Sequence, residues 1–152
     1  MMQTIHVYLD LGRKSVLVGK CRTLTQGVKQ RSMFEYASSW LSQPDAFAID
    51  PARLPFQSSP IHVSMALPGP IRDGAPDRWG RTLVKRCLQK LDARGSIVEA
   101  DYLLSVSDDM RIGALRYKLD GQAELNQTVG AHRIPPLVHL PALLNAADAV
   151  AS

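Results

Sequence analysis

The sequence predicts an α+β fold, in which a few short helices pack against an antiparallel sheet of about five to seven strands. Apolar and polar residues alternate along several short runs, which is the period-two pattern of half-buried strands. Short turns that contain glycine join the first runs, and parallel strands would need longer crossovers. Apolar residues at helical spacing mark two further segments. The predicted strands are 4–10, 16–24, 33–36, 61–67 and 112–119.

A short helical turn and a long irregular passage are expected between the third and fourth strands. Ser38 or Ser39 is placed to cap this turn, which carries Trp40 and Leu41. Prolines at four positions between 44 and 60 then disfavour regular structure. The apolar side chains expected to pin the passage onto the core are Phe47, Ile49, Leu54 and Phe56.

The stretch 71–81 predicts a loop that turns into a helix. Gly74 and Pro76 interrupt the approach, and proline is well suited to the first helical turn. An apolar face follows at helical spacing, and as its first member Trp79 is expected to lie in the core. The other members of this face are Leu83, Cys87, Leu88 and Leu91.

A second face of the same helix is basic and consists of Arg78, Arg81 and Lys85. Three interpretations stay open for it: a solvated surface, a contact for an acidic protein partner, and a nucleic-acid site. If Trp79 is exposed beside the two arginines, the group has the composition of an interface hot spot, where tryptophan and arginine are enriched. These four residues are therefore candidate partner contacts.

The part of the chain after this helix begins with a second helix signal. Ser96 and Glu99 have the spacing of a capping box, which predicts a short helix through Tyr102. A charged turn over 108–111 leads into the last predicted strand. The polar segment 121–136 that follows is expected to be a hairpin or a linker.

The segment 137–152 is expected to hold the start of a final helix, which Pro141 begins. Its apolar stripe needs a cover, which we expect to be a further domain of a longer chain. Residues 1–120 would then form one α+β domain. The further candidate contacts on this stripe are Leu140, Leu143 and Leu144.

Length and charge limit the function classes. A chain of 152 residues can bury a substantial core. The net charge of +4 is spread along the sequence, and few aromatic residues alternate with the basic ones, so direct nucleic-acid binding is not expected. An apolar run of membrane-spanning length and a secretory leader are both absent, which predicts a cytoplasmic protein.

The sequence carries no recognisable catalytic constellation. It lacks a Walker loop and the common hydrolase and metalloprotease motifs. The histidines, His6, His62, His132 and His139, show no metal-ligand spacing. Cys21 and Cys87 lie far apart and are expected to be incidental or buried thiols. Asp108 and Asp109 are interpreted as a turn. We therefore expect no catalytic, cofactor or metal site in this chain.

Several segments, taken in order, resemble the N-terminal region of HipA-type proteins, the serine/threonine kinase toxins of type II toxin–antitoxin systems. Nearly the whole chain is covered, and the order and spacing of the segments carry the resemblance. They are Val7-Tyr8-Leu9-Asp10, Phe34-Glu35-Tyr36 with Trp40-Leu41 and Pro44-Asp45-Ala46-Phe47, the stretch 73–81, Asp101-Tyr102-Leu103-Leu104, and the stretch 108–116.

The resemblance implies an interaction or scaffold domain that precedes a helical kinase core. The parent would be an ATP- and Mg²⁺-dependent kinase whose substrates, in known members, are aminoacyl-tRNA synthetases, and a small helix-turn-helix antitoxin would neutralise it. The kinase motifs have no counterpart in this sequence, so no catalytic residue is carried over. A free-standing inhibitor or antitoxin subunit of a split system is the alternative, and a basic nucleic-acid-binding module is a third.

Overall fold

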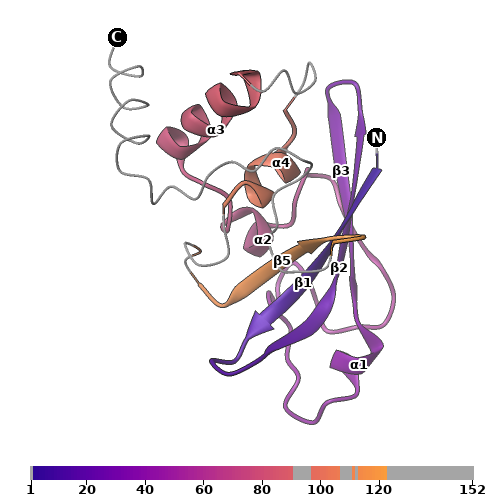
Figure 1. The fold of residues 1–152 in the computed structure, drawn as a ribbon. Coiled ribbons are helices and arrows are strands. Elements are labelled where there is room, and N and C mark those ends of the chain that lie inside the picture. The colour runs from indigo at the N-terminus through magenta and orange to yellow at the C-terminus, as the bar shows by residue number, and fades with distance from the viewer. Residues whose placement is uncertain (1, 91–96, 107–110, 112, 123–152) are drawn as a thin grey trace.

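The structure, a computed structural model, describes residues 2–90, 97–106, 111 and 113–122. These residues form an α+β fold (Figure 1). The strands of this part of the chain make one five-stranded sheet in the order β4-β3-β2-β1-β5, with every neighbouring pair antiparallel. The predicted fold class is therefore confirmed. The strands are β1 (Met2–Asp10), β2 (Ser15–Gln26), β3 (Lys29–Tyr36), β4 (Ile61–Val63) and β5 (Leu115–Leu119).

The helices lie mainly on one side of this sheet, and Figure 1 shows α2, α3 and α4 grouped there with α1 near the opposite end. Ile71 of α2 and Leu103 of α4 are fully buried in the core cluster. The buried Leu83 of α3 is not a member of that cluster, so α3 forms an outer layer. The helices are α1 (Ser38–Leu41), α2 (Gly69–Arg72), α3 (Arg78–Lys90) and α4 (Glu99–Leu104).

The register of the sheet puts one apolar row on its covered face. Ile5 pairs with Cys21, and Cys21 pairs with Phe34 on the next strand. All three side chains are fully buried. In the adjacent row Gly19 pairs with Tyr36, and a Cβ on Gly19 would come within 2.8 Å of the Phe34 ring. Glycine is therefore needed at this point of β2, where the aromatic core approaches the backbone.

The strand boundaries differ most from the prediction at the start of β3 and the end of β4. β3 begins at Lys29 instead of residue 33, because its backbone pairs with β2 up to the turn, where Gln26 lies opposite Lys29. β4 ends at Val63 instead of residue 67. Ser32 of β3 then donates a 2.9 Å hydrogen bond to the Met65 carbonyl, and the chain turns inward to bury Leu67. Backbone pairing, which apolar alternation does not report, sets these ends.

The irregular passage between α1 and β4 is pinned to the core as expected, although by hydrogen bonds as well as by apolar packing. The Tyr36 hydroxyl donates to the Leu54 carbonyl at 2.6 Å and accepts from the Ile49 amide at 3.1 Å. Leu54 is fully buried, whereas Phe47 is about half exposed and packs its ring against Trp40.

The helix starts required three corrections. Ala37, not Ser38 or Ser39, is the N-cap residue of α1, and no side-chain cap is formed there. A short helix, α2, occupies the proline-rich approach that was expected to be a loop, with Pro70 in its first turn, where a missing N–H costs nothing. The third correction concerns the capping box expected from Ser96 and Glu99: the N-cap residue of α4 is Val98, and the Asp101 carboxylate accepts from its amide at 2.9 Å. Glu99 is therefore free to face α3.

Several predictions fall outside the described residues. These are the capping role of Ser96, the turn residues Asp108 and Asp109, the two C-terminal histidines, the linker beyond residue 122 and the final helix with Leu140, Leu143 and Leu144. Within the described residues, no helix has both the length and the apolar character needed to cross a lipid bilayer.

Candidate functional site

Helix α3 begins after Pro76 because Asp77 caps it. The Asp77 carboxylate accepts from the Gly80 amide at 2.9 Å, and its carbonyl accepts from the Arg81 amide at 2.8 Å. A side-chain cap of this kind satisfies an amide that has no partner within the helix. Pro76 therefore precedes the cap instead of lying in the first turn, and Arg78 is the first helical residue.

Arg81 is the residue that joins α3 to α4. Its guanidinium forms a bidentate ion pair with Glu99, with both N–O distances at 2.8 Å, and donates to the Pro76 carbonyl at 3.2 Å. It also lies 4.9 Å from the centre of the Tyr102 ring. The hydrogen bonds from Arg81 hold the pKa of Glu99 below its ordinary value. Arg81, predicted as a partner contact, thus also has a structural role.

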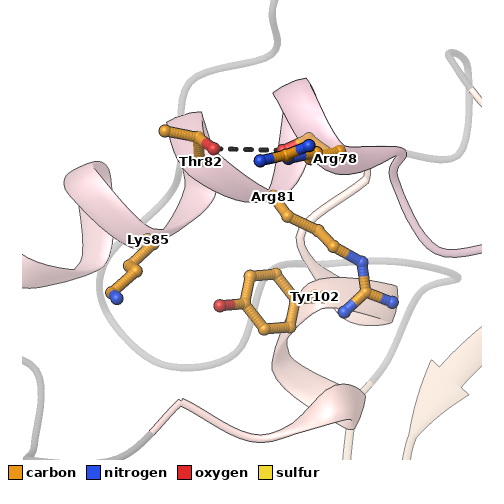
Figure 2. A pocket seen from close by; sticks show the side chains of 5 residues that line it. All are labelled: Arg78, Arg81, Thr82, Lys85 and Tyr102. Carbon is orange, nitrogen blue, oxygen red and sulfur yellow. Dashed lines mark hydrogen bonds between the residues drawn. The ribbon is translucent and has the colours of Figure 1, made fainter. Parts of the chain in front are cut away.

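The predicted basic face lines a shallow hollow between α3 and α4 (Figure 2). Its volume is about 480 Å³. One wall consists of side chains that recur at helical spacing along α3, namely Arg78, Arg81, Thr82 and Lys85. Tyr102 of α4 lies opposite them. The structure therefore brings together the three predicted basic residues and adds Thr82 and Tyr102. The walls offer cationic donors and hydroxyl groups, a set that suits an anionic ligand.

Trp79 is exposed, and its predicted place in the core is wrong. Its exposed fraction is 49%, whereas Leu83, one turn further along the same face, is only 4% exposed. The reason is the position of the helix start, because Trp79 lies in the first turn, before the part of α3 that is buried. An exposed tryptophan next to Arg78 matches the alternative interpretation, an interface composition.

A second arginine, Arg111, organises the interior beneath this site. It was expected in a charged turn, but it is only 7% exposed. Its guanidinium donates to the carbonyls of Gly74, Leu103 and Val106 at 2.9–3.0 Å, and it lies 4.6 Å from the centre of the Tyr117 ring. Arg111 therefore ties the loop before α3, the C-terminal end of α4 and strand β5 together.

A comparison with protein families identifies the family of this chain. The family model described as the HipA N-terminal domain matches residues 13–118, well over half of the chain. The chain belongs to the HipA N-terminal domain family. The match spans α3, the hollow and Arg111. No curated protein and no solved structure matches the chain. The resemblance of the N-terminal region to HipA-type proteins is thus confirmed.

In this HipA N-terminal domain, two other chemically versatile side chains, Cys21 and His6, lie on strands of the sheet. Cys21 is buried in the sheet, and desolvation raises the pKa of its thiol to about 12, so it is un-ionised at neutral pH. His6 lies on β1, and its Nε2 is 3.0 Å from the carboxylate of Asp120, which follows the edge strand β5. Among the described residues, no three histidine, cysteine or acidic side chains come close enough together to hold a metal ion.

Sequence reasoning missed three residues of the assembly as functional partners: Glu99, Tyr102 and Arg111. Glu99 was assigned to a helix cap, yet its partner Arg81 is 18 residues away. Arg111 was assigned to a turn, and it reaches the Gly74 carbonyl 37 residues away. Local spacing holds no signal for such contacts.

Proposed function

We propose that this HipA N-terminal domain is the interaction and scaffold domain of a HipA-like protein serine/threonine kinase toxin, and that it contacts the kinase core and a small helix-turn-helix antitoxin. The observation that carries the proposal is the family match over residues 13–118. In this proposal the parent kinase uses ATP and Mg²⁺ and acts on an aminoacyl-tRNA synthetase. Those parts lie with the kinase core and not with this domain.

The outer position of α3 supports a contact role. Leu83 and Val84 are buried, but they are not part of the core cluster, and Arg81 supplies the ion pair that joins the helix to α4. The solvent side of α3 presents Trp79 and a row of cations. An exposed tryptophan beside arginine is costly to leave in water and is a frequent anchor of protein interfaces.

Binding measurements with the two expected partners test the proposal. The 152-residue chain is mixed with the kinase core, and separately with the antitoxin, and complex formation is followed by size-exclusion chromatography and calorimetry. We expect a complex with at least one of them, and we expect Trp79→Ala to weaken it by about 30-fold, the loss of a hot spot worth about 2 kcal/mol.

A matched control separates the interface from general effects of losing an aromatic group. Phe47 has a similar exposed fraction, 51%, but lies in the passage after α1, so Phe47→Ala is expected to leave binding unchanged. Absence of a complex with both partners would contradict the proposal. So would tight, Mg²⁺-dependent ATP binding by the 152-residue chain, because that chemistry is assigned to the kinase core.

A further inference from the structure

The hollow beside α3 has an unbalanced charge. The thirteen residues of α3 include five cations and no acidic residue. Glu99 of α4 lies next to Arg81, which lines the hollow, and both of its carboxylate oxygens accept hydrogen bonds from the Arg81 guanidinium. Arg78 and Lys85 are exposed, and no carboxylate of the described residues pairs with either side chain. The charge of these two cations is therefore left for a ligand.

The spacing of the two cations defines the shape of that ligand. Arg78 and Lys85 are seven residues apart, which places them on one face of the helix, about 10 Å apart along its axis. Figure 2 shows Lys85 on the hydroxyl side of the Tyr102 ring and the Arg81 guanidinium on the opposite side of that ring. The hollow lies between these groups.

We infer that this hollow binds the carboxylate side chains of an acidic helical segment of a protein partner, with one carboxylate at Arg78 and a second at Lys85. A helix that carries carboxylates two turns apart repeats the same 10 Å spacing, since both helices rise about 1.5 Å per residue. Charge-assisted hydrogen bonds to carboxylates are the strong class of such bonds. The inference rests on the proposed function, because it supplies the chemistry of the partner.

The observations favour a protein over a nucleic acid. Proteins that bind duplex DNA through its backbone commonly make about 6–10 phosphate contacts. Among the described residues, two cations that line this hollow, Arg78 and Lys85, have no carboxylate partner, whereas Arg81 is paired with Glu99. Trp79, 49% exposed at the start of the same helix, adds an apolar group of the kind that anchors protein interfaces.

A pair of synthetic peptides tests the inference. The first is a fluorescein-labelled, alanine-rich helical peptide of about 14 residues, roughly four turns, with glutamates at positions i, i+4 and i+7. The second carries glutamine at the same positions. Binding to the 152-residue chain is measured by fluorescence polarisation. We expect the glutamate peptide to bind at least about tenfold more tightly, with an affinity that falls as salt is raised.

Two charge-reversed variants locate the binding. Arg78→Glu combined with Lys85→Glu is expected to lower the affinity for the glutamate peptide by at least about tenfold, to that of the glutamine peptide. The matched control reverses Arg13 and Lys14, two exposed cations in the β1–β2 turn, and makes the same change in net charge. This control is expected to change the affinity by less than about twofold.

Three results would overturn the inference: equal binding of the two peptides, an equal loss of binding in both variants, or displacement of the glutamate peptide by duplex DNA at lower concentration than by unlabelled peptide. The milder pair Arg78→Gln and Lys85→Gln repeats the test if the reversed variant loses its thermal transition. None of these results decides whether the chain forms a complex with the kinase core or the antitoxin, which is measured separately. Failure of this inference is therefore distinguishable from failure of the proposed function.

Discussion

Replacing Arg111 by alanine removes the group that joins three parts of the domain. The guanidinium supplies hydrogen bonds of 2.9–3.0 Å to the carbonyls of Gly74, Leu103 and Val106. Leu103 lies in the last turn of α4, where helix carbonyls lack partners within the helix and a cation is favourable, and Val106 follows two residues after the helix ends. The same group stacks on Tyr117, which is 1% exposed. Alanine satisfies none of these contacts.

The expected loss of stability depends on how many of these three carbonyl acceptors remain inaccessible to water when the guanidinium is removed. A hydrogen bond from a charged donor contributes about 1.5–3 kcal/mol, so three would give at least about 4.5 kcal/mol if all acceptors were left unsolvated. The bonds to Gly74 and Val106 are only partly buried, so water can replace them, while the bond to Leu103 is buried. We therefore expect Arg111→Ala to lower the free energy of unfolding by about 3–5 kcal/mol, a large share of the roughly 5–15 kcal/mol typical of a domain.

Urea denaturation followed by circular dichroism measures this loss. Arg111→Lys keeps the charge but cannot reach all three acceptors, so we expect an intermediate loss of about 2 kcal/mol and a variant that still folds. Arg31, an exposed arginine of β3, is the matched control, and Arg31→Ala is expected to change the free energy of unfolding by less than about 0.5 kcal/mol. A loss below about 1 kcal/mol for Arg111→Ala would refute the reasoning.

The remaining predictions concern α3 and its supports. Trp79→Ala is expected to lower the free energy of unfolding by less than about 1 kcal/mol, and Leu83→Ala by roughly 2–5 kcal/mol, because only Leu83 is buried; similar losses in urea denaturation would contradict this. Gly74→Ala is expected to cost about 1–3 kcal/mol by the same measurement, since its Cβ would lie 2.9 Å from a buried tyrosine hydroxyl, and an unchanged transition would show that the loop is free to move. Glu99→Gln is expected to cost about 1 kcal/mol at neutral pH. Arg81 lowers the folded-state pKa of Glu99, so the stability from this ion pair is complete above the ordinary pKa of 4.5 and is lost as the pH falls through the folded-state pKa. The free energies of unfolding of wild type and Glu99→Gln should therefore converge in acid. A difference between them that persists in acid would exclude the ion pair as its source.

Alternation and turn composition were sufficient to predict the sheet. Ile5, Val7 and Leu9 are all buried on one face of β1, as their spacing predicted, because a strand directs successive side chains to opposite faces. The segment 115–119 likewise turns Tyr117 into the core. The ends of β3 and β4 were less predictable, because backbone pairing with a neighbour extends or ends a strand without an apolar signal.

The candidate site was likewise predictable only in part. The helical period placed Arg78, Arg81 and Lys85 on one face of α3, and the structure confirms that they share a surface. The period also placed Trp79 with the apolar residues, but which turns of a helix are covered depends on where its neighbours lie. Trp79 precedes the covered turns and is therefore exposed.

The sequence by itself determined the α+β class, the antiparallel strands, the basic face of α3 and the HipA-like character, because each depends on local periodicity or on the order of short motifs. Only the tertiary structure decided that Arg81 is held by Glu99 and that Arg111 is buried beneath the site. The physical reason is that each arginine has a partner far along the chain: Glu99 lies 18 residues from Arg81, and Gly74 lies 37 residues from Arg111. Contacts that form only on folding therefore decide which basic side chains are available to bind a partner protein.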